Sequence, residues 1–201
     1  MSTPTPSPTP SIVVVYHSGY GHTKVVAEQL HRGVASVAGV TAHLVSVDEL
    51  PAPGPDRPLG GQWPLLTQAD CIVFGAPTYM GGPSAKFKEF ADRTSGLWFK
   101  QQWKDKLAAG FSNSDNLSGD KLSTLQYMSL LAAQHGMIWI SLGMLPGNPH
   151  DPSTPNRVGS NLGLMTQSDQ ASPEVTPGPG DCETARLFGV RIAELTKRFK
   201  A

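Results

Sequence analysis

The feature that most constrains the fold is an apolar segment that runs directly into a small polar turn and then into an amphipathic helix. Residues 12–16 read IVVVY and residues 17–23 read HSGYGHT. Apolar residues then recur at the spacing of one helix face, at Val26, Leu30, Val34 and Val37. The pattern predicts a strand, a turn and a helix that begins near Thr23, in the succession typical of an α/β protein.

The turn has the properties of a phosphate-binding loop. The first turn of a helix leaves about four N–H groups unpaired and carries the positive end of the helix dipole, so it attracts anions. Ser18 and Thr23 add hydroxyl donors, and Gly19 and Gly21 let a ligand approach the backbone. Neither the nucleoside-triphosphate motif G-x-x-x-x-G-K-[ST] nor the dinucleotide fingerprint G-x-G-x-x-G occurs. The loop therefore suits a terminal phosphate monoester, with an ordinary anion-free helix start as the alternative.

Strand-like and helix-like segments alternate along the remaining chain. Further strands are predicted at 40–47, 71–76, 107–111 and 137–141, and further helices after Ser84, over 121–135, and after Asp181 as the N-cap. A Pro- and Gly-rich connection covers 51–64, and 143–180 is a long stretch that is either functional or disordered. Because right-handed crossovers join parallel strands, this order predicts a parallel sheet with helices on both faces.

Three polar loops follow predicted strands, at 18–23, 77–81 and 112–119. Ligands of parallel sheets bind beyond the carboxyl ends of the strands, so these loops should meet. The first offers phosphate donors, the second a backbone turn beside a flat slot, and the third hydroxyls, amides and backbone N–H groups. A ligand with a phosphate at one end and a planar polar ring at the other, such as flavin mononucleotide (FMN), satisfies all three.

Composition argues against several classes of function. The 201 residues include 16 basic and 16 acidic side chains, so a nucleic-acid surface is not indicated. The cysteines Cys71 and Cys182 lie far apart, and the histidines lack metal-ligand spacing, so no metal site is expected. No apolar run is long enough for membrane insertion, and a cytoplasmic location is predicted. Residues 1–10 alternate Pro with Ser or Thr, which predicts a disordered tail before one domain at 11–201.

Four motifs occur in a fixed order: SGYGHT at 18–23, FGAPTYMG at 74–81, GLW at 96–98 and HGM at 135–137. Together they resemble those of the flavodoxin-like NAD(P)H:quinone oxidoreductases of the tryptophan-repressor-binding-protein (WrbA) type. The resemblance implies a flavodoxin-like three-layer sandwich with a five-stranded parallel sheet of order 2-1-3-4-5. It also implies FMN as cofactor, NAD(P)H as co-substrate, a quinone as acceptor and a homotetramer or dimer.

The resemblance also assigns residues to the FMN site. The phosphate and ribityl chain would bind Ser18, Gly19, Tyr20, Gly21, His22 and Thr23. The isoalloxazine would lie against Pro77, Thr78, Tyr79, Met80 and Gly81 and against Ser112, Asn113, Ser114, Asp115, Asn116 and Leu117. His135 would approach the flavin from the rim or from a neighbouring subunit, although a histidine at a helix end is equally typical of a cap. Tyr20 and Trp98 would bind nicotinamide and quinone, with Trp98 as a plain core or interface aromatic in the alternative.

Two departures from the family pattern affect these assignments. Tyr79 and Met80 replace an arginine–aromatic pair, and residues 113–117 replace most glycines of the family's S-T-G-T-x-x-G-G-Q-E loop. The implied activity is a two-electron, ping-pong reduction of quinones. An FMN-dependent reductase of another acceptor, a flavodoxin-like electron carrier and a flavin-free binding module remain alternatives, although the neutral charge balance argues against the acidic docking surface of a carrier.

Overall fold

The sheet contains the five predicted strands in the predicted order. The computed structural model describes residues 9–52 and 59–201, so most of the predicted tail and part of the 51–64 connection lie outside it. The parallel strands run β2-β1-β3-β5-β6 across the sheet. Their bounds are β1 (Ser11–Tyr16), β2 (Thr41–Ser46), β3 (Cys71–Tyr79), β5 (Leu107–Ser114) and β6 (Ile138–Trp139).

Two short strands enlarge the sheet from the five predicted strands to seven. β4 (Gly82–Pro83) folds back antiparallel on the end of β3. β7 (Leu164–Gln167) runs parallel to the last four residues of β5, whereas β6 pairs with the first two. β6 and β7 therefore share one edge of β5, and part of the long 143–180 stretch belongs to the sheet.

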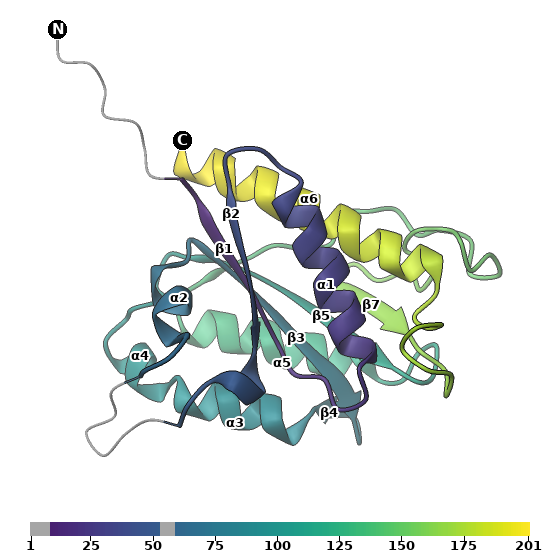
Figure 1. Ribbon diagram of the computed structural model, residues 1–201, viewed down its shortest axis with the longest axis horizontal. Coiled ribbons are helices and arrows are strands. Elements are labelled where there is room, and N and C mark those ends of the chain that lie inside the picture. Colours follow the sequence, from purple (N-terminus) through teal and green to yellow (C-terminus); the bar gives the residue numbers. More distant parts are fainter. Residues whose placement is uncertain (1–8, 53–58) are drawn as a thin grey trace, which may run out of the picture.

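Alternation along β1 explains the three layers of the sandwich (Figure 1). Val13 and Val15 join a core with the helices of one face, whereas Ile12 and Val14 join a separate core on the other face. The first face is covered by α2 (Trp63–Gln68), α3 (Ala85–Arg93), α4 (Ser95–Phe99) and α5 (Lys121–Gln134). The second is covered by α1 (His22–Ala35) and α6 (Pro179–Lys200), and a short helical turn, η1 (Val47–Glu49), follows β2.

Glycines allow α1 and α6 to pack closely. A Cβ atom added at Gly33 would lie 2.0 Å from the carbonyl oxygen of Arg186, and one at Gly189 would lie 2.1 Å from that of Leu30. The predicted N-cap of the last helix is wrong, because α6 begins at Pro179 with Gly178 as its N-cap. Asp181 lies inside the first turn, and its buried carboxylate forms an ion pair with Arg157.

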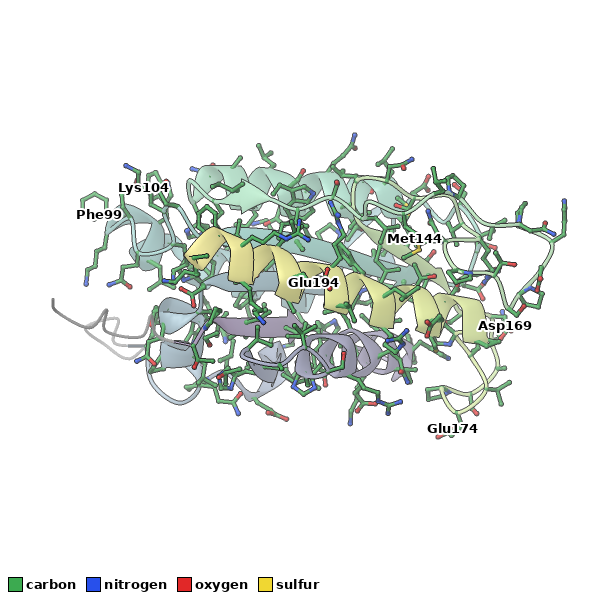
Figure 2. All side chains as sticks on the ribbon, turned by 90° about the horizontal axis from the view of Figure 1, so that it is seen from above. Phe99, Lys104, Met144, Asp169, Glu174 and Glu194 are labelled. Atoms are coloured by element: carbon green, nitrogen blue, oxygen red, sulfur yellow. The ribbon has the colours of Figure 1, made fainter. Side chains whose placement is uncertain are left out.

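The carboxyl ends of β1, β3, β5 and β7 meet at one end of the sheet, beside the start of α1 (Figure 1). Figure 2 shows Asp169, in the loop after β7, at this end of the molecule and Phe99, in α4, at the other. Within the described ranges, no helix combines the length and apolar character needed to cross a membrane.

Candidate functional site

The loop between β1 and α1 presents hydrogen-bond donors to one point. Gly21, the N-cap of α1, has φ 94°, a conformation that glycine adopts readily. The Ser18 hydroxyl oxygen accepts hydrogen bonds from the N–H groups of Gly21 (3.1 Å) and Lys24 (3.2 Å), which leaves its proton available for a ligand. The N–H groups of His22 and Thr23 lie in the first helical turn, where no intrahelical acceptor exists. This donor set suits an anionic oxygen group.

The end of β3 is fixed by buried hydroxyl groups. The Thr78 hydroxyl contacts those of Ser112 (2.8 Å) and Thr124 (2.7 Å), and Ser112 donates to the Ala76 carbonyl (2.9 Å). These bonds join β3, β5 and α5 at one level. The predicted site residues Thr78 and Ser112 therefore hold the ends of their strands together.

A tight hairpin connects β3 to β4 and forms part of the rim. Met80 and Gly81 both have positive φ, 48° and 79°, as a two-residue turn of this kind requires. Met80 is fully exposed, and the Gly81 carbonyl accepts a hydrogen bond from Ser123 of α5. Tyr79 and Tyr20 are exposed by 39% and 76%, and their rings meet edge to face with centroids 6.3 Å apart. The two tyrosines place an aromatic surface beside the phosphate-type loop.

A buried lysine holds the loop after β5. Lys121 has no exposed surface, and its Nζ donates to Ser114 Oγ (2.9 Å) and to the carbonyls of Asn116 (2.8 Å) and Leu117 (2.9 Å). Burial lowers the pKa of Lys121 to about 8. Lys121 thus fixes the backbone of the loop after β5. In this loop other residues replace most of the glycines of the family pattern.

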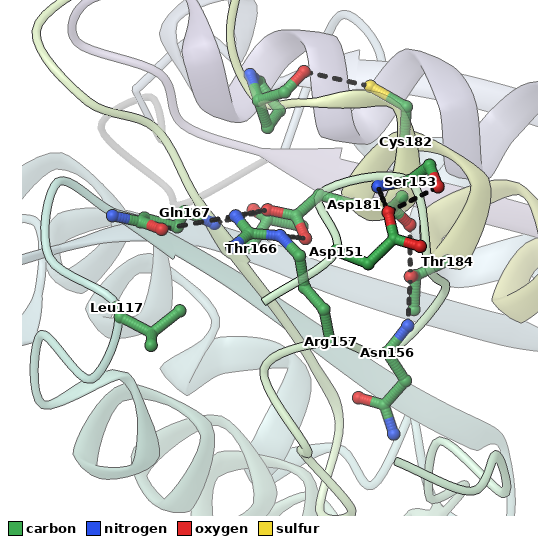
Figure 3. A network of polar contacts seen from close by, with 12 residues as sticks. Leu117, Asp151, Ser153, Asn156, Arg157, Thr166, Gln167, Asp181, Cys182 and Thr184 are labelled. Carbon is green, nitrogen blue, oxygen red and sulfur yellow. Dashed lines mark hydrogen bonds and ion pairs between the residues drawn. The ribbon is translucent and has the colours of Figure 1, made fainter. Parts of the chain in front are cut away.

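A second buried charge fixes β7. Arg157 donates through Nε and Nη2 to the two carboxylate oxygens of Asp181, both at 2.9 Å, and Nη2 also donates to Gln167 Oε1 (3.2 Å) (Figure 3). The Gln167 N–H donates to the same carboxylate at 2.8 Å. Asp181 is only 1% exposed, so this ion pair joins the end of β7 to the start of α6 away from water.

The segment 168–173 runs from the end of β7 back to the phosphate-type loop. His22 Nε2 donates to the Ala171 carbonyl at 2.8 Å, and a Cβ atom added at Gly21 would lie 2.9 Å from the Pro173 ring. The sequence does not predict that β7 and the 168–173 segment form one side of the site. The sequence signal for a strand is weak here, since the four-residue run LMTQ lies in a stretch rich in Pro, Gly, Asn and Ser.

All three predicted loops and the 168–173 segment surround a cavity of about 370 Å³, a size that is typical of small-molecule sites. Its lining is Ser18, Tyr20, His22, Thr23, Pro77, Thr78, Tyr79, Asn113, Ser114, Asp115, Ser168, Asp169 and Gln170. Asp115 and Asp169 are acidic, and no lysine or arginine occurs among these described lining residues. Neutral donors at one end and polar groups beside two aromatic rings fit a phosphate joined to a planar ring, as in FMN.

Other predicted site residues lie in the same loops without lining the cavity: Gly19, Gly21, Met80, Gly81, Ser112, Asn116 and Leu117. His135 and Trp98 are not brought to the cavity of their own chain. The α5 helix runs from the cavity towards the other end of the sheet, over roughly 21 Å at 1.5 Å per residue, and His135 follows its last residue.

His135 is buried in its own subunit. It is 2% exposed, its Nε2 lies 2.8 Å from Thr94 Oγ1, and its ring packs on the fully buried Trp103. The Thr94 hydroxyl donates to the Ala91 carbonyl, so Nε2–H is the donor to Thr94. Burial lowers the pKa of His135 to about 4, which makes it neutral rather than a capping cation. With Trp98 it lines a second cavity of about 360 Å³.

Comparisons with known proteins agree with this geometry. Residues 11–146 match the family model described as NADPH-dependent FMN reductase. The chain is 43% identical to flavodoxin FldP of Pseudomonas aeruginosa, over 94% of this chain and 98% of that protein. It is 32% identical to quinone-oxidoreductase QR2 of Triphysaria versicolor, over 94% and 96% of the two chains.

A solved structure is also similar, that of the flavodoxin, WrbA-like protein from Agrobacterium tumefaciens. The TM-score is 0.71 and the identity 43%, over 94% of this chain and 98% of that one. Fold, cavity and sequence agree on one assignment. The chain is therefore an FMN-binding oxidoreductase that belongs to the NADPH-dependent FMN reductase family.

Proposed function

We propose that this protein is an FMN-dependent NAD(P)H:quinone oxidoreductase. The observation that carries the proposal is the cavity at the carboxyl ends of the strands, with phosphate-type donors at one end and the exposed rings of Tyr20 and Tyr79 at its mouth. The relative from Triphysaria versicolor is named a quinone-oxidoreductase, and one from Geobacter sulfurreducens, 28% identical, is named NAD(P)H dehydrogenase (quinone). Both names support this substrate class.

Each loop has a separate role in the proposal. Ser18, Thr23 and the first N–H groups of α1 hold the phosphate, and the backbone at 77–81 and 112–117 lies against the ring. Tyr20 and Tyr79 receive the flat rings of nicotinamide and quinone at the mouth. When bound, FMN supplies the hydride and two-electron chemistry that links these two substrates.

The proposed kinetic mechanism is ping-pong. Two walls of the cavity are closed, one by the β3 and β5 ends and the other by the 168–173 segment, which His22 holds against α1. One open side then serves both flat substrates, which must each come within about 3–3.5 Å of the reacting ring. They occupy the same slot in turn.

The proposed assembly is a homotetramer in the cytoplasm. Apolar side chains are exposed near the second cavity, at Trp98 (40%), Phe99 (82%) and Leu130 (67%). In the proposed assembly the cavity lined by Trp98 and His135 faces the flavin of a neighbouring copy. If sedimentation shows only a monomer, and this monomer has full quinone reductase activity, the proposed shared site is rejected.

A flavodoxin-like electron carrier is the second candidate, because the relative that is 43% identical is named a flavodoxin. Anaerobic addition of NADH or NADPH separates the two roles. An oxidoreductase loses its flavin absorbance with the nicotinamide alone, and benzoquinone restores it. Loss of absorbance that requires a separate reductase protein would instead favour the carrier.

A further inference from the structure

The side chain of Asn113 is held in one orientation at the cavity wall. Asn113 is 4% exposed, lies near the end of β5, and is paired in the sheet with Pro77 of β3 and with Thr166 of β7. Its Oδ1 lies 2.8 Å from Thr166 Oγ1 and 2.9 Å from Ser168 Oγ. Both hydroxyls come from β7 and the residue that follows it, within the 143–180 stretch in which the sequence predicts no strand.

Burial of the hydroxyl groups decides which branch of the amide is the oxygen. Thr166 is fully buried, and among the residues described its hydroxyl has no acceptor other than Asn113 Oδ1. If the amide were flipped, this buried hydroxyl proton would have no acceptor, which is unfavourable because a buried donor without a partner loses its hydration without compensation. Oδ1 therefore accepts hydrogen bonds from both hydroxyl groups, and Nδ2 is the other terminal atom of the amide, directed away from these hydroxyls.

The Nδ2 group is left as an uncommitted donor at the cavity. It makes no hydrogen bond to any part of the chain that the structure describes, and Asn113 lines the cavity between Pro77 and Ser114. The acidic side chains Asp115 and Asp169 line the same cavity, and no lysine or arginine occurs among its described lining residues. Nδ2 is thus a fixed neutral donor in a cavity that Asp115 and Asp169 also line.

We infer that the Asn113 amide donates a hydrogen bond to the polar edge of the bound flavin ring, and that Thr166 and Ser168 are positioning residues for this donor. The inference rests on FMN binding in the proposed function. Reduction by two electrons increases the negative charge on that edge, and a hydrogen bond to a charged acceptor is about twice as strong as one to a neutral acceptor. Asn113 consequently favours the reduced form of the cofactor.

The test compares the affinity of the protein for oxidised and reduced FMN, by anaerobic titration of the apoprotein. Asn113→Leu removes the donor without adding charge, and it should lower the preference for reduced over oxidised FMN about tenfold relative to wild type. This equals a decrease of about 30 mV in the midpoint potential of the bound two-electron couple. Asn113→Asp should lower the preference for reduced FMN further, because a negatively charged carboxylate replaces the amide donor. Thr166→Val, which only loosens the donor, should have a smaller effect in the same direction.

Two matched controls separate this role from a structural one. Thr196→Val removes a fully buried hydroxyl from α6, and Asn156→Asp changes a 3% exposed asparagine outside the cavity. Both should leave the preference and the midpoint potential unchanged, even where they lower the melting temperature. An unchanged preference in Asn113→Leu would overturn the inference, whereas failure of wild type to bind FMN would overturn the proposed function itself.

Discussion

The two ends of the cavity are built in different ways. The phosphate-type end comes from consecutive residues, 18–23, in which a strand, a turn and a helix start follow one another. The opposite wall joins Asn113 of β5 to Thr166 and Ser168, more than 50 residues away along the chain. The first end depends on local backbone geometry, and the second on buried polar contacts between distant segments. Substitutions at the first end should therefore change phosphate binding with little loss of stability, whereas substitutions that break buried polar contacts at the second end should also lower stability.

Arg157→Met should give the largest effect, on stability. It leaves the 1% exposed Asp181 carboxylate without its partner, which should lower the free energy of unfolding by about 3–5 kcal/mol in denaturant titrations. Arg186→Met is the matched control, because the side chain of its partner Glu183 is 41% exposed and the loss should stay below about 1 kcal/mol. Equal losses in the two variants would show that the buried Arg157–Asp181 ion pair contributes no more to stability than a surface pair.

Replacing Ser18 and Thr23 together by alanine should weaken FMN binding by about 2–4 kcal/mol, because two hydroxyl partners of a buried phosphate are lost. Riboflavin, which has no phosphate, should bind nearly as well as to wild type. Fluorescence titration with both ligands measures the two affinities. Equal losses for FMN and riboflavin would mean that this loop does not hold the phosphate.

The buried Lys121 makes the stability of the protein depend on pH. Its pKa is lowered to about 8 in the folded protein from 10.5, so above pH 8 the unfolded state binds more protons and stability rises with pH. Relative to Lys121→Met, wild type should gain about 1 kcal/mol between pH 8 and pH 9. Unfolding curves of both proteins at the two pH values test this, and a constant difference would show that burial does not lower the pKa of Lys121.

Asp115→Asn should have the smallest effect. Asp115 is exposed at the cavity rim, so its charge is partly screened, and its removal should favour reduced FMN by only about 0.2–1 kcal/mol. The effect should fall as salt increases. An effect as large as that of Asn113→Leu would mean that charge at the rim, rather than the fixed donor, controls the cofactor.

The same contrast explains what could be predicted from the sequence. The five strands and the 18–23 loop follow from local patterns, because apolar runs and a glycine-containing helix start are visible in a few consecutive residues. The strand order does not follow from such patterns and is implied only by the family resemblance. β7 was missed because its four residues are stabilised by β5 and by Arg157, neither of which is local. The sequence pattern predicts Asp181 as a helix cap for the same reason, since its ion-pair partner Arg157 lies 24 residues away.

Steady-state kinetics with both substrates varied tests the central claim most directly. If one cavity serves nicotinamide and quinone in turn, double-reciprocal plots at several fixed quinone concentrations should be parallel. Each substrate should also inhibit competitively against the other at high concentration. Intersecting plots without mutual competition would require two separate sites and would contradict the single-cavity account.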